Sequence, residues 1–207
     1  MTLNQIADAA AALHLTPLGG FHDDGQTTVL IGPLEPGFWA YVSNRPEFKH
    51  GAPDPLDAWS AWAITALGYV TGSEPVFPFG GPPFHPFISW ALHSGEAWQS
   101  PVGLLVHKEA GLLVSYRGAL IFDRLIDLPS PTAINPCVSC VHQPCLSACP
   151  VDALGPKNYD VPRCKSHIDT DIICQSGCRV RMACPVSQSY PRDPDQTAFH
   201  MKAFHPT

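Results

Sequence analysis

The chain has 207 residues, a formal net charge of −6 at pH 7, and 14% charged against 45% hydrophobic residues. This composition supports a buried core and excludes wholesale disorder, and the acidic balance argues against nucleic-acid binding through a basic face. All eight cysteines lie after residue 136, where they make up about 11% of the residues. That density is typical of a disulfide scaffold or a metal-cluster domain, so the composition divides the chain in two.

The cellular compartment is expected to be the reducing cytoplasm. The first 15 residues contain no basic region and include Asp8, so they do not match a signal peptide. The longest apolar stretch, residues 58–70, is too short and too polar to span a bilayer. In a reducing compartment, clustered cysteines bind metal more often than they form disulfides.

The N-terminal part begins with a predicted helix over residues 2–15. Thr2 and Gln5 have the spacing of a capping box, and an apolar stripe follows at helical intervals. The next elements are predicted in chain order as turns at 18–20 and 23–25, a buried strand over 27–31 ending at Gly32-Pro33, and a short helix near 38–42.

A second long helix is predicted to begin at Asp54-Pro55, with Asp as N-cap and Pro in the first turn, and to end between Gly68 and Gly72. The loop at 77–87 is too rich in Pro and Gly to form a helix interior or a central strand. The remaining elements are a helix over 86–98 interrupted near Gly95, strands over 102–106 and 112–122 joined by a hairpin turn at 109–111, and a linker over 127–136.

These elements predict an α+β fold for residues 1–130, with a small and mainly antiparallel sheet packed against helices. Residues 131–207 are predicted to form a compact, Cys-rich domain of short helices and loops.

The cysteines form two motifs that both end in Cys-Pro. The motifs are Cys137-x2-Cys140-x4-Cys145-x3-Cys149-Pro150 and Cys174-x3-Cys178-x5-Cys184-Pro185, with Cys164 between them. Eight thiolates make two sets of four, which is the ligand count of two [4Fe–4S] clusters, and these clusters prefer soft thiolate ligands.

Two other interpretations stay open at this point. The bacterial ferredoxin run is C-x2-C-x2-C-x3-C-P, and the second gap is longer here, with His142 inside it. Two zinc sites of four cysteines each would use the same residues, and structural disulfides are a further alternative. His142 is not needed as a ligand, because eight thiols already complete two sets.

The segments Cys137–Pro150, Arg163-Cys164-Lys165 and Cys174–Pro185 resemble the double-cluster ferredoxin module of the epoxyqueuosine reductases and their relatives. The resemblance implies crossed ligation, in which each cluster takes ligands from both cysteine motifs. It assigns a first cysteine set of Cys137, Cys140, Cys145 and Cys184, and a second cysteine set of Cys149, Cys164, Cys174 and Cys178.

The resemblance extends upstream to residues 106–122 and to the Phe79–Phe84 loop, which are also similar to CblC-type cobalamin-processing proteins and to reductive dehalogenases. In those families a nitroreductase-like domain holds cobalamin and receives electrons from the clusters. The N-terminal part here is shorter than such a domain, and it has no clear counterpart of the catalytic acid.

Several residues outside the cysteine motifs are candidate ligand-binding positions. The loop residues either contact a ligand or pack on the core, and Arg117 either contacts a ligand or pairs with an acid such as Asp123. His107 and Tyr116 are candidate proton donors or ordinary packing residues. The possible ligand-binding set is Phe79, Gly80, Gly81, Pro82, Tyr116 and Arg117.

The expected function is electron transfer through two [4Fe–4S] clusters. The alternatives are a corrinoid-dependent reductase and a zinc-bound interaction module. Because four thiolates and an oxidised cluster together carry a charge of about −2, we expect a redox partner with a basic docking patch.

Overall fold

The computed structural model describes residues 1–130, 132–156 and 158–206. The chain divides into two compact units, which are Met1–Glu96 with Ser115–Thr132, and Ala97–Val114 with Ala133–Thr207. The predicted class is confirmed at the coarse level, because the structure combines helices with a small antiparallel sheet.

The first unit contains a four-stranded sheet with the order β1-β2-β6-β3, in which every neighbouring pair is antiparallel. Strand β2 lies between β1 and β6, and all of its residues after the first are buried, including Thr27 and Thr28. The strands are β1 (Leu15–Asp23), β2 (Gln26–Pro33), β3 (Glu74–Val76) and β6 (Gly118–Phe122).

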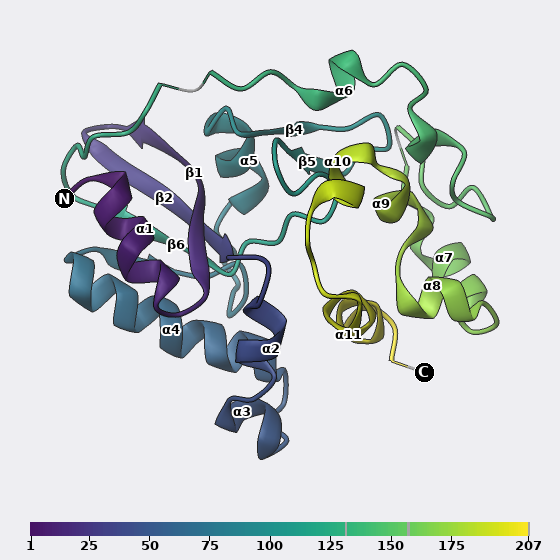
Figure 1. Ribbon diagram of the computed structural model, residues 1–207, viewed down its shortest axis with the longest axis horizontal. Helices are drawn as coiled ribbons and strands as arrows, with labels where there is room; N and C mark the ends of the chain where they lie inside the picture. The colour runs from purple at the N-terminus through teal and green to yellow at the C-terminus, as the bar shows by residue number, and fades with distance from the viewer. Residues whose placement is uncertain (131, 157, 207) are drawn as a thin grey trace. The chain divides into compact units, whose positions relative to one another are not determined.

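Helices α1 and α4 contact each other and the sheet, and they lie along it in Figure 1. Helix α4 buries Trp59, Ala63 and Leu67 on one face, and Phe38 of α2 packs edge-on against Trp59. The helices of this unit are α1 (Leu3–Ala11), α2 (Phe38–Val42), α3 (Pro46–Lys49), α4 (Pro55–Thr71) and α5 (Phe87–His93).

The second unit contains a two-stranded sheet and a series of short helices. Its apolar cluster joins Val102, Val106 and Leu112 to Cys145, Leu154, Val180 and Cys184. The elements are β4 (Ala97–Gln99), β5 (Leu105–His107), α6 (Pro136–Ser139), the 3-10 helix η1 (Pro144–Leu146), α7 (Val161–Ile168), α8 (Ile172–Ser176), α9 (Arg179–Ala183), α10 (Pro185–Ser189) and α11 (Pro194–Phe204). Among the described residues, no helix is both long and apolar enough to cross a bilayer.

The predicted hairpin between strands 102–106 and 112–122 is wrong. Strand β5 pairs with β4, whereas β6 begins only at Gly118 and pairs with β2 and β3. The turn itself exists as a bridge between His107 and Gly111, but Leu112 then packs into the apolar cluster of the second unit. The sequence predicts residues 97–114 to lie in the first domain, but they group with the Cys-rich segment.

Three other local predictions need correction. Gly19 and Gly20 do not form a turn, because they lie in β1, where the register shifts after Pro17. Helix α1 ends at Ala11, and Leu15 is fully buried as the first residue of β1. The predicted helix over 86–98 ends at His93, and Ala97–Gln99 forms β4 instead.

The capping box of α1 supports a stability prediction. The amide of Thr2 donates to Oε1 of Gln5 at 2.9 Å, and the amide of Gln5 donates to Oγ1 of Thr2 at 3.3 Å. Thr2→Ala removes an acceptor for a helix N–H group and is expected to lower the free energy of unfolding by about 1 kcal/mol. Urea unfolding of this variant beside Thr2→Ser, which keeps the hydroxyl, measures the effect. Equal midpoints for the two variants would contradict it.

Candidate metal centre

The eight cysteines all carry free thiols, and all belong to the second unit. Short helices that begin with proline in their first turn hold several of them in place, because proline sets the backbone angle of the first turn and needs no amide partner. Asn135 caps α6 through the amide of Cys137, and Asp171 caps α8 through the amide of Cys174. The sulfur-bearing residues are therefore positioned by helix ends rather than by a sheet.

The first cysteine set lines a cavity of about 620 Å³. Cys145 and Cys184 are buried, and Cys137 and Cys140 are partly exposed. Apolar residues such as Val106, Leu112 and Val186 line the same cavity, together with Ser139, His142 and Gln143.

The second cysteine set lines a separate and smaller cavity of about 20 Å³. Cys174 is buried, while Cys149, Cys164 and Cys178 are partly exposed. Each cavity thus gathers four thiols, and the grouping coincides with the two sets that the resemblance implies. The assignment of these thiols as cluster ligands stays a prediction.

Burial and thiol crowding both disfavour the ionised thiols. Burial is the main cause that raises the pKa values of Cys137 and Cys145, and thiols of the first set raise them further. The pKa of Cys164 is raised first by burial and is also raised by Cys178 and Cys149, which belong to the second set. Four soft donors that repel one another as thiolates suit a positively charged metal centre, so the donor chemistry of both sets fits an iron–sulfur cluster or a zinc ion.

Hydrogen-bond donors reach several sulfur atoms. The amide of Ala153 donates to Sγ of Cys149 at 3.2 Å, and the hydroxyl of Tyr159 donates to Sγ of Cys164 at 3.5 Å. Burial raises the pKa of the Cys174 thiol, and the nearby guanidinium of Arg179 opposes that shift. Such bonds stabilise negative charge on sulfur and influence the properties of any bound metal centre.

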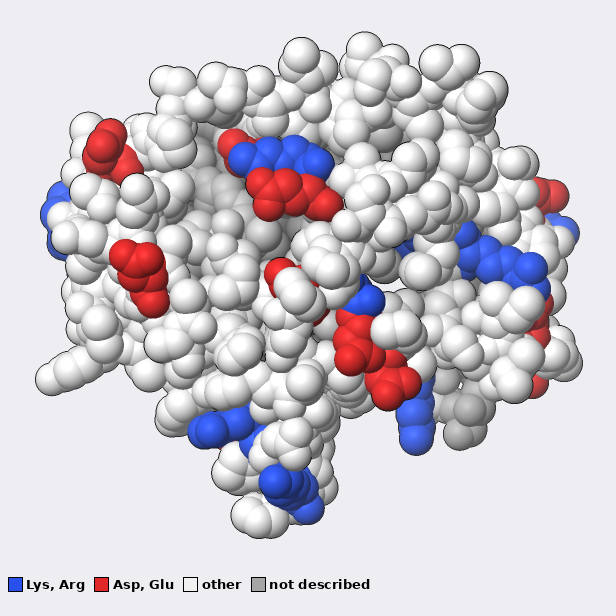
Figure 2. Space-filling model, in the orientation of Figure 1, with Lys and Arg blue, Asp and Glu red and all other residues white. Residues whose placement is uncertain are grey.

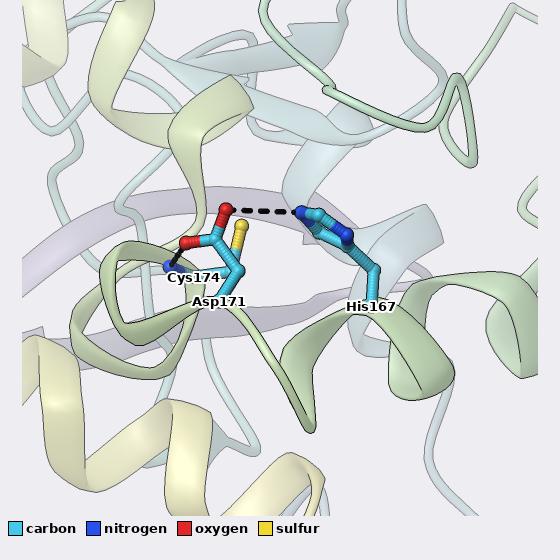
Figure 3. A group of neighbouring side chains, drawn as sticks. All are labelled: His167, Asp171 and Cys174. Atoms are coloured by element: carbon cyan, nitrogen blue, oxygen red, sulfur yellow. Dashed lines mark hydrogen bonds and ion pairs between the residues drawn. The ribbon is translucent and has the colours of Figure 1, made fainter.

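Figure 3 shows the Asp171 carboxylate reaching toward the imidazole of His167, with the Cys174 sulfur beside it. Asp171 Oδ2 lies 3.1 Å from His167 Nε2 and accepts a hydrogen bond from Arg179 at 2.8 Å. Its other oxygen accepts from the amides of Ile173 and Cys174. The amide of Cys174 is the largest cause that lowers the Asp171 pKa, to about 2.

The ligand atoms of His167, Asp171 and Cys174 all lie within 4.8 Å of one another, a combination of N, O and S donors that could hold a metal ion. However, both carboxylate oxygens already accept protein hydrogen bonds, and Cys174 also lines the second cavity. Neither His167 nor Asp171 is among the candidate residues predicted from the sequence. Two features of the sequence could have indicated this pair. His167 and Asp171 are four residues apart, and Asp171 lies directly before a helix as its N-cap.

The ion pair expected for Arg117 forms with a different partner. Its guanidinium pairs with Asp57 of α4 and donates from Nε to Ser60 at 2.9 Å, so the expectation of Asp123 is wrong. Asp123 accepts from Gln26 at 2.7 Å instead. Burial lowers the Arg117 pKa, and the neighbouring Asp57 opposes that shift. The arginine charge is therefore neutralised within the first unit.

The candidate loop places Phe79 5.8 Å from the Arg117 guanidinium and stacks it on Phe77 at 5.3 Å. Gly80 and Pro82 are exposed, whereas a Cβ on Gly81 would meet the ring of Phe84 at 2.6 Å. The loop is therefore an aromatic segment that lies beside the Arg117–Asp57 ion pair.

The two candidate proton donors are both largely buried. His107 accepts hydrogen bonds at Nδ1 from the amides of Glu109 and Ala110, so its imidazole stabilises the turn at 107–111. Burial is the main cause that raises the pKa of Tyr116, and the charge of Glu96 raises it further.

Comparison of the chain with family models, with curated proteins and with solved structures gave no match.

The raised thiol pKa values predict a pH dependence for the metal-free protein. The affected thiols of Cys137, Cys145, Cys164 and Cys174 have an ordinary pKa of 9.0 when unfolded. Because the folded protein holds these protons more tightly, its stability is greatest below pH 9 and decreases as the pH rises toward the raised values.

Urea unfolding midpoints, measured under reducing conditions across this pH range, show whether stability decreases above pH 9 as expected. The Cys137→Ala/Cys145→Ala variant removes two of the shifted thiols, so its midpoint is expected to fall less steeply. A wild-type midpoint that rises above pH 9 would contradict the prediction.

Proposed function

We propose that this protein is an iron–sulfur electron-transfer protein with one [4Fe–4S] cluster at each cysteine set. The observation that carries the proposal is the gathering of eight free thiols into two cavities with four thiols each. When bound, such a cluster supplies a centre that accepts and releases one electron. The same motifs support the proposal that the chain is related to the epoxyqueuosine reductase group.

The residues of the chain have distinct parts in this proposal. The thiolates of each set would provide the ligands. Ala153 and Tyr159 donate hydrogen bonds to sulfur and stabilise its negative charge. Val106, Leu112 and Val186 provide apolar contacts in the first cavity and limit the access of water to it.

Motif spacing favours iron–sulfur over zinc at the first set. Structural zinc sites usually pair two separated cysteine knuckles. The first motif instead has four cysteines within one run and ends in Cys-Pro, which is closer to a ferredoxin.

Electrostatics supports a basic partner. Two oxidised clusters with their thiolates would bring the net charge from −6 to about −10. Figure 2 shows acidic and basic side chains in small separate groups among uncharged residues on the visible face. A partner protein with a basic patch would be attracted by the overall charge, and the association would weaken with added salt.

The test is metal and sulfide analysis of the full chain purified without oxygen, followed by electron paramagnetic resonance (EPR) after reduction with dithionite. We expect about eight irons and about eight inorganic sulfides per chain, with a paramagnetic signal that appears on reduction. About two zinc ions without iron would overturn the proposal in favour of a zinc-bound module. Stoichiometric cobalt in addition to iron would indicate the corrinoid-dependent reductase.

A further inference from the structure

A hydroxyl group from outside the cysteine motifs reaches the second cysteine set. The hydroxyl of Tyr159 donates to Sγ of Cys164 at 3.5 Å, and Tyr159 is 38% exposed. A phenol keeps its proton at neutral pH, so this group is a hydrogen-bond donor there. The contact joins the cysteine that stands between the two motifs to a side chain that is not among the proposed ligands.

The last turn of α11 holds the aromatic ring of Tyr159 in place. Phe204 stacks on this ring with 6.1 Å between the ring centroids and 13° between the ring planes. On the Phe204 ring lies Nζ of Lys165, 5.2 Å from the centroid. Because Lys165 follows Cys164 directly in α7, Phe204 connects the Tyr159 ring to the helix that carries the sulfur.

Two further contacts place the same end of α11 at the second set. Nε2 of His205 lies 2.7 Å from Oδ1 of Asp169, which is the C-cap of α7. Met201 lines the second cavity. The end of α11 contains no cysteine, but it is fixed to α7 and to the cavity, so Phe204 gives the partly exposed Tyr159 ring a defined position.

We propose that the Tyr159 hydroxyl, positioned by Phe204, raises the reduction potential of the cluster at the second cysteine set. The inference rests on the proposed function. Reduction takes one electron from an external donor and adds one negative charge to the cluster and its thiolates. An O–H group that donates to a thiolate sulfur stabilises the more negative, reduced state more than the oxidised one. Tyr159 keeps its proton in both states.

The experiment is a dithionite titration of the loaded full chain, followed by EPR, on the wild-type protein and on Tyr159→Phe. This substitution removes the hydroxyl but keeps the ring that stacks on Phe204. At a fixed potential within the second-set transition, the ratio of reduced to oxidised cluster should fall about threefold. That fall corresponds to a midpoint lower by about 28 mV for a one-electron couple. The first-set midpoint should not change.

Two controls identify the shifted midpoint and test its origin. Cys137→Ala/Cys184→Ala leaves only the second set complete, so the midpoint that remains belongs to that set. Tyr69→Phe removes another tyrosine hydroxyl, from a residue of α4 that is 91% exposed, and should leave both midpoints unchanged.

A double-mutant cycle tests whether Phe204 acts through Tyr159. Phe204→Leu removes the stacking ring and should lower the second-set midpoint in the wild-type background, but not in the Tyr159→Phe background. Water admitted by the smaller side chain would stabilise the added charge and raise the midpoint, so exposure does not explain a fall. An equal fall in both backgrounds would overturn the positioning role of Phe204.

Iron content separates failure of the inference from failure of the proposed function. A wild-type protein without iron would overturn the proposed function itself. If Tyr159→Phe retains about eight irons and its second-set midpoint is unchanged or higher, the inference is overturned while the proposed function stands. If Tyr159→Phe loses iron, the Phe204→Leu midpoints decide in the same way, because that variant retains the hydroxyl and all eight thiols.

Discussion

Replacing Cys149 and Cys184 together with alanine is expected to abolish nearly all iron binding, whereas replacing Cys137 and Cys184 together should remove only about half. The first pair draws one thiol from each cavity, so neither set of four stays complete. The second pair comes from one cavity and leaves the second set complete. Iron per chain, measured on anaerobically purified protein, distinguishes the two variants.

The control for these double variants is His142→Ala. His142 lines the first cavity and carries a potential metal-binding nitrogen, but four thiols are already present there. This variant should retain about eight irons. Equal iron loss in the two double variants would show that the cysteines do not act as the two sets described here.

Replacing Asp57 with asparagine is expected to lower the free energy of unfolding by about 2 kcal/mol, less than for a fully buried ion pair because the Asp57 side chain is 39% exposed. The Arg117 side chain is only 8% exposed, and its guanidinium pairs with Asp57. Asparagine preserves the shape of the side chain but removes the charge, which leaves a buried cation without its counter-charge. Urea unfolding monitored by tryptophan fluorescence measures the loss, since Trp59 lies fully buried in the same helix.

The double variant Asp57→Asn/Arg117→Met is the matched control. Methionine fills much of the arginine volume without charge, so this variant should recover most of the lost stability. If the double variant is as unstable as Asp57→Asn, the loss comes from packing or the helix terminus rather than from an unpaired charge.

Short-range signals in the sequence predicted much of the first unit correctly. The capping box at Thr2, the buried strand around 27–31 and the start of α4 at Pro55 all appear in the structure, although the Asp54 side chain makes no capping hydrogen bond. Each of these signals acts within a few residues, through a hydrogen bond, a run of buried side chains or a restricted backbone angle. Such effects are encoded locally, and so they can be recognised without the rest of the fold.

Strand pairing was not predictable in the same way. The stretches at 102–106 and 112–122 have strand-like composition, but composition does not specify which strand forms the hydrogen bonds. In the structure β5 pairs with β4, β6 completes the other sheet, and Leu112 packs beside Cys145 and Val180. These choices depend on burial against residues distant in the chain.

The cysteine motifs by themselves established a dense group of thiols with ferredoxin-like spacing and a count suited to two metal centres. The resemblance already implied that Cys184 joins the first motif, and the tertiary structure places it in that cavity and the other four thiols in a second one. Only the tertiary structure brought Tyr159 to the sulfur of Cys164, joined Arg179 to Asp171 and paired Arg117 with Asp57. The physical reason is that hydrogen bonds and ion pairs act over a few ångströms in space, so partners distant in the chain become defined only when the fold brings them together.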